Sequence, residues 1–293
     1  MVSMTRALSP GCGLAAIGLA AAALTTACSV ASARPGEPAA GYEVYAVRYG
    51  TLPGFPVRAL VAGADSSRRM DIALMVWLLK GPSGRTVLVD AGFYRDKFMQ
   101  RWKPADYVRP DTAVARVGVT PGDVSDLIIS HVHWDHLDGV DLFPRARLWI
   151  QRAEYEYYVG PDGQRRHEGI DADDAAVLAR LKASGRLALV DGDGQQILPG
   201  ITVYTGGRHT YASQYVGVRT RAGRAIIASD NVYLYENLER RLPIAQTFDA
   251  RSNLAAQARM LELAASPRLI VPGHDPAVFE RFPRPGHGVA RIE

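Results

Sequence analysis

The chain has 293 residues, of which 47% are hydrophobic and 22% are charged. This composition excludes a disordered chain and a fibrous one, and the length suits one large domain or two small ones. The formal net charge is +4, but the basic residues are scattered along the chain, so we expect no nucleic-acid partner. Cys12 and Cys28 are the only cysteines, so the chain after residue 28 can form neither an internal disulfide nor a thiolate metal site.

The first 33 residues carry the features of an export signal. Arg6 precedes the apolar stretch from Leu14 to Leu24, and small residues follow up to Ala33. Because this stretch is shorter than the roughly 20 residues of a membrane-spanning helix, we predict a signal peptide at 1–33 and an exported protein, periplasmic or secreted. The residues before Cys28 also resemble a bacterial lipoprotein cleavage site, in which case lipidated Cys28 would anchor the protein to a membrane.

A folded domain is predicted over residues 42–293, after a Pro/Gly/Ala linker at 34–41. Apolar runs bounded by turn residues predict strands, and apolar residues at helical spacing predict helices. The aromatic segment 93–109 fits either a cover over a pocket or a packed helix. The strands are expected at 42–49, 71–79, 86–89, 126–130, 146–151, 187–190, 201–205, 215–219, 225–229 and 269–271, and the helices at 171–184 and 251–265.

Strands dominate this order, with helices interspersed in each half. The Gly-Pro-Ser-Gly sequence at 81–84 is a turn, so the second and third strands are expected to form a β-hairpin. Two sheets with helices packed against them are the simplest way to bury so many strands. We therefore predict the α/β class, as an αββα sandwich of two packed mixed sheets with outer helices.

A dense set of metal-ligand side chains follows the strand predicted at 126–130. The sequence His-Val-His-Trp-Asp-His at 131–136 places four such ligands within six residues. In extended backbone His131 and His133 point to the same side, and a turn through Asp135 can direct that carboxylate and His136 toward a neighbouring metal ion. This spacing predicts a site for two metal ions.

Three further ligands are predicted where later strands end. His209 follows a Gly-Gly pair, Asp230 follows the strand at 225–229, and His274 follows a Val-Pro-Gly sequence. With these residues, five of the seven histidines become metal ligands. The other two, His167 and His287, are expected to be solvated.

The motif and the later ligands resemble those of the metallo-β-lactamase superfamily, over about residues 42–283. Asp90, in a Val-Asp-Ala-Gly sequence, matches the structural aspartate of the superfamily and would orient the metal loop. The resemblance implies one group of ligands for each metal and a carboxylate that bridges them. One metal would be held by His131, His133 and His209, and the other by Asp135, His136 and His274. The bridging carboxylate would be Asp230.

Within this superfamily the chain looks most like the N-acyl homoserine lactonases, on the segments 150–156, 229–233 and 272–275. The resemblance implies a dinuclear metal-dependent hydrolase in which a metal-bridging hydroxide opens a lactone ring. Tyr233 would contact the substrate carbonyl, and Asp135 or Asp230 would carry a proton to the leaving oxygen.

The imidazole-rich ligand set favours zinc, although a shared carboxylate also admits iron, manganese or cobalt. Trp134 occupies an aromatic position that would face the acyl chain, and 211–213 reads Tyr-Ala-Ser where these lactonases often have Pro-Gly-His. The expected partner is a small-molecule lactone or ester.

Other activities use similar sites. A periplasmic β-lactamase would suit the export signal, but zinc β-lactamases generally carry Cys or Ser where this chain has Asp230. Another carboxylic-ester hydrolase or a phosphodiesterase stays open, although no tight cluster of Lys and Arg marks a phosphate pocket. From a different class, an exported binding protein could sequester a metal or a lactone, and it would not need the complete ligand set.

Overall fold

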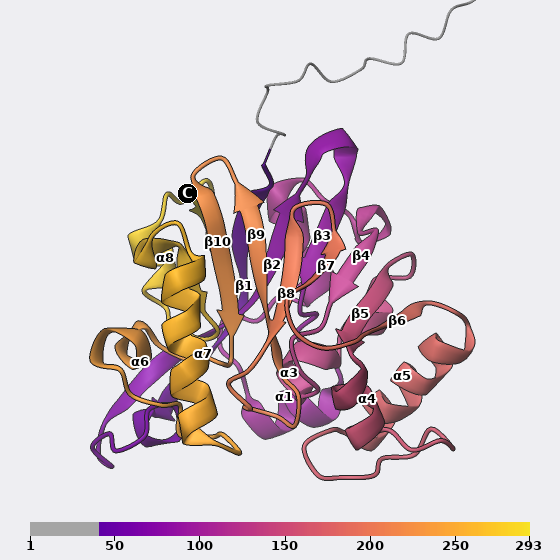
Figure 1. Cartoon of the computed structure of the whole chain (residues 1–293), viewed down its shortest axis with the longest axis horizontal. Helices are drawn as coiled ribbons and strands as arrows, with labels where there is room; N and C mark the ends of the chain where they lie inside the picture. The colour runs from indigo at the N-terminus through magenta and orange to yellow at the C-terminus, as the bar shows by residue number, and fades with distance from the viewer. Residues whose placement is uncertain (1–40) are drawn as a thin grey trace, which may run out of the picture. The chain divides into compact units, whose positions relative to one another are not determined.

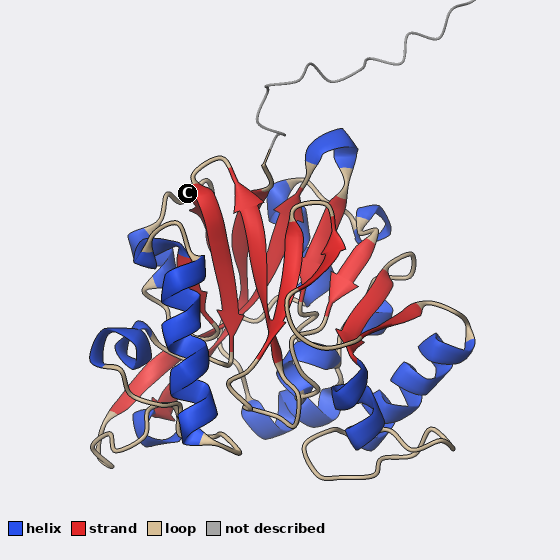
Figure 2. Cartoon of the chain, in the orientation of Figure 1, coloured by secondary structure: helices blue, strands red, loops and turns tan. Residues whose placement is uncertain are grey.

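Two β-sheets lie at the centre of the computed structural model, which describes residues 41–293 (Figure 2). The predicted signal peptide, Cys12, Cys28 and nearly all of the linker lie outside the described residues. Within residues 41–293 no helix is both long and apolar enough to cross a membrane. The predicted fold class is confirmed, because both sheets mix parallel and antiparallel pairs and helices pack on them.

The larger sheet has seven strands in the order β12-β1-β2-β3-β4-β5-β6. Its strands from β3 to β6 run parallel, whereas β12, β1, β2 and β3 pair antiparallel. The bounds are β1 (Glu43–Pro56), β2 (Arg69–Lys80), β3 (Thr86–Val89), β4 (Asp126–Ile128), β5 (Arg147–Gln151), β6 (Leu187–Val190) and β12 (Val289–Ile292).

The smaller sheet has five strands in the order β11-β10-β9-β8-β7, of which only the β10–β11 pair is parallel. Its strands are β7 (Gln195–Leu198), β8 (Ile201–Thr205), β9 (Gln214–Thr220), β10 (Gly223–Ser229) and β11 (Ile270–Pro272). The α-helices are α1 (Asp96–Trp102), α2 (Pro110–Ala113), α3 (Trp134–Leu137), α4 (Arg152–Tyr158), α5 (Ala172–Ala183), α6 (Tyr235–Arg240), α7 (Ala250–Leu263) and α8 (Val278–Arg281).

Strand β2 shows why an unbroken apolar run forms a central strand. Successive side chains of a strand point to opposite faces, so a strand that is covered on both sides needs apolar residues at every position. Met75 and Trp77 pack between the two sheets with residues of β8, β9 and β10. Leu74, Val76 and Leu78 pack on the other face with residues of α3 and α5.

The outer face of the smaller sheet is covered by α7, which runs beside β10 in Figure 1. Ala256 and Met260 of α7 pack with Ile226 and Ala228 of β10. The layers are therefore helices, sheet, sheet and helix, with the largest buried side chains between them.

Several elements differ from the sequence prediction. β1 continues past residue 49 to Pro56, because β-bulges between Arg48 and Gly50 and between Leu52 and Phe55 accommodate residues that read as strand breakers. The segment 93–109 contains α1. The short helices α2, α3, α4, α6 and α8 and the strands β7 and β12 were not predicted. These missed elements have four to seven residues each, too few for a clear periodic pattern.

Candidate metal centre

The six-residue motif crosses from an extended segment into a short helix. After β4 the chain has no helical turn until His133, an extended residue that lies at the N-terminal cap of α3 (φ −66°, ψ 152°). His131 therefore projects from extended chain, whereas Asp135 and His136 project from the first turn of α3. This is the change of direction that the sequence predicted.

The remaining predicted ligands come from the ends of strands in the smaller sheet. His209 lies in the loop between β8 and β9, Asp230 follows β10 directly, and His274 follows β11. The residues that follow β4 of the larger sheet thus meet the residues that follow β10 and β11 of the smaller sheet.

The structure brings all seven predicted ligands together as two adjacent groups of donor atoms. Within each group the atoms lie within 4.8 Å of one another. We call His131, His133 and His209 the histidine half, which Asp230 joins, and Asp135, His136 and His274 the carboxylate half.

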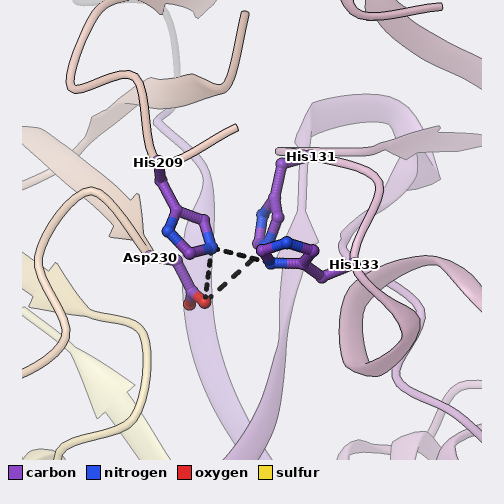
Figure 3. Close-up of side chains that lie close together, drawn as sticks. All are labelled: His131, His133, His209 and Asp230. Carbon is purple, nitrogen blue, oxygen red and sulfur yellow. Dashed lines mark hydrogen bonds and ion pairs between the residues drawn. The ribbon is translucent and has the colours of Figure 1, made fainter. Parts of the chain in front are cut away.

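The carboxylate of Asp230 lies between the two halves. Its Oδ2 atom is 3.4 Å from Nε2 of His209 and 3.7 Å from Nε2 of His131. Its Oδ1 atom is 3.1 Å from Nε2 of His274 and 3.3 Å from Nε2 of His136. Figure 3 shows the side chains of the histidine half and Asp230 converging on one point. One oxygen thus faces each half, as in a carboxylate that bridges two metal ions.

Four of the five imidazoles are fixed in orientation through their second ring nitrogen. Such outer hydrogen bonds set the tautomer and aim the free nitrogen at a metal. Nδ1 of His136 lies 2.8 Å from Asp90 Oδ2, and Nδ1 of His209 lies 2.8 Å from the Gln246 carbonyl. Nδ1 of His274 lies 2.9 Å from the Ala73 carbonyl, and Nδ1 of His131 lies 2.9 Å from Ser130 Oγ.

Asp90 is completely buried beneath the metal loop. It accepts hydrogen bonds from the backbone N–H of Ser130 (2.7 Å) and from the hydroxyls of Ser130 (2.8 Å) and Ser229 (2.9 Å). Together with its contact to His136, these bonds connect the loop after β4 to the end of β10. The position fits the orienting role expected from the sequence.

Two backbone features aim Asp230 at the centre. Ser229 has φ +47°, a left-handed conformation that is uncommon for a residue with a side chain. Gly273 passes so close that a Cβ there would lie 2.5 Å from Asp230 Oδ1. A side chain at position 273 would therefore displace the carboxylate.

The two halves differ in their electrostatics. Burial, with neighbouring imidazoles, lowers the pKa of His131 well below its ordinary value, that of His133 to about 4 and that of His209 to about 3. Burial acts in the same direction on His136 and His274, but the carboxylates of Asp230 and Asp135 outweigh it and raise both pKa values. Burial opposes ionisation of Asp230 as well, yet His136 and His274 hold its pKa well below the usual range.

The donor set fits divalent metal ions. His136 Nε2 and Asp230 Oδ1 are buried and, although they lie 3.3 Å apart, neither forms a well-directed hydrogen bond with a described residue, which is a costly arrangement without a ligand. Imidazole nitrogens and carboxylate oxygens are ligands of zinc and of other first-row divalent metals. Residues 41–293 contain no cysteine, so this part of the chain offers no thiolate ligand.

Tyr233 lies beside both halves. Its ring centroid is 5.4 Å from that of His209 and 5.8 Å from that of His274, and the side chain is buried. Burial raises the pKa of its hydroxyl well above the ordinary value, so the group keeps its proton and can donate a hydrogen bond.

A cavity of about 390 Å³ opens above the carboxylate half and Tyr233. Its apolar wall includes Phe55 and Ile72 from the β1–β2 hairpin and Trp134 from the metal motif. The ring of Trp134 stacks on those of Trp102 (centroids 4.9 Å apart, planes 5° apart) and Phe98 (5.2 Å, 26°). A larger hollow of about 660 Å³ lies between α4 and α5, and its lining contains none of the predicted ligands.

Two histidines lie away from this centre, as the sequence predicted. His167 and His287 are exposed and belong to neither donor group. Sequence reasoning missed Glu154, which is buried behind the histidine half, and a cluster in which the half-buried Arg95 pairs with the buried Asp138, which follows α3, and with the buried Asp174. Their only sequence signal is an acidic residue beside apolar ones, which is usual for exposed helix positions.

Comparison with known proteins identifies the family. Residues 74–274 match the model of the metallo-beta-lactamase superfamily. This match covers most of the chain and includes every predicted metal ligand. The chain therefore belongs to the metallo-β-lactamase superfamily.

Several curated relatives are named as N-acyl homoserine lactonases. An N-acyl homoserine lactonase from Bacillus cereus is 32% identical over 167 residues, which cover 56% of this chain and 61% of the relative. Another from a Bacillus species is 27% identical over 221 residues, covering 70% of this chain and 82% of the relative.

The structure of an N-acyl homoserine lactone hydrolase, with the product N-hexanoyl-L-homoserine at its catalytic metal centre, superposes with a TM-score of 0.66. The identity is 22%, with 81% of this chain and 94% of that chain covered, so this likeness concerns the fold.

Proposed function

We propose that the protein is a dinuclear metal-dependent hydrolase that opens the lactone ring of N-acyl homoserine lactones or related lactones. The observation that carries this proposal is Asp230, whose two oxygens each face a different group of donor atoms at the base of a cavity. The named activity of the sequence relatives supports the choice of substrate.

Divalent ions at such a centre supply Lewis acidity and a water-derived nucleophile near neutral pH. Zinc is the proposed ion, because imidazole nitrogens make up most of the donor atoms. Metal analysis of the purified protein tests this choice against iron, manganese and cobalt.

The chain's own groups position the substrate and move the proton. The Tyr233 hydroxyl, which stays protonated, donates to the lactone carbonyl oxygen and stabilises the negative charge that develops there. Asp135, which lines the cavity, would accept the proton that the attacking water releases and carry it to the ring oxygen that departs, with Asp230 as the second candidate. The apolar wall of Phe55, Ile72 and Trp134 binds the acyl chain and excludes water.

The test is hydrolysis of N-acyl homoserine lactones of several chain lengths by the metal-loaded protein, with proton release and the opened product followed together. The matched variant is Asp230→Ala, and the control substrates are a β-lactam, a simple carboxylic ester and a phosphodiester. Metal-dependent lactone opening that disappears in the variant is the expected result. Intact lactones beside rapid turnover of a control substrate would reassign the enzyme, and no turnover of any would favour a binding role.

We also propose that the protein is exported. The support is the sequence alone, with Arg6, the apolar stretch and the small residues up to Ala33. The mass of the protein recovered from the periplasm or medium tests cleavage near Ala33. A lipid-modified N-terminal Cys28 would instead indicate a membrane-anchored lipoprotein.

A further inference from the structure

Glu154 is a completely buried carboxylate on α4, outside the cavity and outside both donor groups. No basic side chain of residues 41–293 forms an ion pair with it, and burial raises its pKa to about 7. An acidic group in such a place is costly to bury unless hydrogen bonds offset the loss of water. The hydrogen-bond donors to Glu154 therefore indicate which part of the molecule it supports.

Three donors converge on Glu154, and they come from two loops. Its Oε1 atom accepts from the backbone N–H of Val132 (3.3 Å) and from the hydroxyl of Thr210 (2.5 Å). Its Oε2 atom accepts from the backbone N–H of Ala212 (2.6 Å). Val132 lies between His131 and His133, and Thr210 follows His209. One carboxylate thus ties together the two loops that carry the histidine half.

The carboxylate half has no such contact with Glu154. His136 is supported by Asp90, and His274 is supported by the carbonyl of Ala73. Any change at Glu154 should therefore act first on one half of the centre and not on the other.

We propose that Glu154 is a positioning residue that sets the spacing of His131, His133 and His209, and through it the affinity of the histidine half for its metal ion. The inference rests on the proposed function only in that both halves hold metal ions. Loss of an outer hydrogen-bonding partner of metal ligands typically lowers metal affinity about 10- to 100-fold.

The first experiment compares Glu154→Gln with the matched control Glu156→Gln. Glutamine keeps the size of the side chain but presents an N–H₂ group where only acceptors fit, so at least one of the three bonds is lost. Glu156 is two positions away on the same helix, exposed, and paired only with Arg152. Zinc affinity is measured by titration of each metal-free protein in competition with a chromophoric chelator.

The expected result is that one zinc equivalent of Glu154→Gln binds about 10- to 100-fold more weakly, while the other keeps the wild-type affinity. Glu156→Gln should match the wild type at both. Equal weakening of both equivalents would point to a general loss of structure and overturn the proposal. Affinities equal to those of Glu156→Gln would overturn it as well.

Thr210→Val provides a second variant if Glu154→Gln fails to fold. It removes one hydroxyl donor while keeping the branched shape, and we expect the same selective weakening at a smaller size, restored in Thr210→Ser. Wild-type zinc affinity in Thr210→Val would overturn the proposal. The zinc titration needs no substrate, so a wild-type protein that binds two zinc ions but opens no lactone would sink the proposed function and leave this inference standing.

Discussion

The two halves of the centre use the same side chain in opposite electrostatic surroundings. In the histidine half, burial among other imidazoles holds the pKa of His133 at about 4 and that of His209 at about 3. In the carboxylate half, Asp230 and Asp135 raise the pKa values of His136 and His274 despite equal burial. The difference teaches that neighbouring charges decide the protonation of a buried imidazole when desolvation is the same.

The structures behind the two halves differ in a similar way. Glu154 supports the histidine half by binding backbone and hydroxyl groups. Behind the carboxylate half, Arg95 binds both Asp138, which follows α3, and Asp174 at the start of α5. Neutral donors therefore surround Glu154 behind the histidine half, whereas an ion-pair cluster lies next to α3, the helix that carries Asp135 and His136.

The largest expected effect comes from removing one ligand of each half. His209→Ala and His274→Ala should each retain about one zinc equivalent and lose more than about 100-fold in kcat/KM, because a direct ligand costs more than an outer partner. Metal analysis of each purified variant gives the zinc content, and steady-state kinetics of lactone hydrolysis give kcat/KM. If either variant lost both equivalents, the division into two halves would be wrong.

A smaller effect is expected for Tyr233→Phe, because Tyr233 contacts both halves without belonging to either donor group. Loss of the hydroxyl should lower kcat by about 100-fold, the lower end of the range for donors to a developing oxyanion, and leave two zinc equivalents bound. The measurement is steady-state kinetics beside metal analysis. Zinc loss in this variant would place Tyr233 among the groups that hold the metals.

The ion-pair cluster predicts a pH dependence of stability. Burial, with the nearby charge of Asp138, raises the pKa of Asp174 from 3.8 to about 7 although Arg95 opposes the shift. Because the folded state holds this proton more tightly, the stability contribution is complete below the unfolded pKa and is lost as pH rises toward 7. Relative to Asp174→Asn, the wild type should lose up to about 1 kcal/mol in free energy of unfolding per pH unit across this window.

Denaturant unfolding of both proteins between pH 4 and pH 7 measures this difference. A constant difference across the window would show that Asp174 is already ionised in the folded protein. Glu154 should give a shift of the same sign behind the histidine half, since burial raises its pKa to about 7 as well.

The smallest effect is expected at a histidine that belongs to neither half. The ring of His167 stacks on Tyr157 at a centroid distance of 4.0 Å and is exposed to solvent. His167→Ala should retain both zinc equivalents and change kcat/KM less than about twofold, since exposed substitutions are usually mild. A loss of zinc here would mean that the donor groups are incomplete.

Much of the centre could be predicted from the sequence because the ligands lie within six residues or directly after strands. The orientation of Asp230 could not, since it depends on the left-handed backbone of Ser229 and on Gly273 from a distant strand end. Glu154 was missed for a similar reason. Its partners are 22 to 58 positions away, and α4 is too short to show which face is buried.

The four-residue strand β12 has a consequence for solubility. It pairs with β1 from Val44↔Ile292 to Val47↔Val289 and so occupies the edge of the larger sheet. Without it, the long and largely buried β1 would present unpaired backbone groups at the surface, which is a template for strand addition from another molecule. By pairing with β1, β12 thus lowers the tendency of the larger sheet to aggregate.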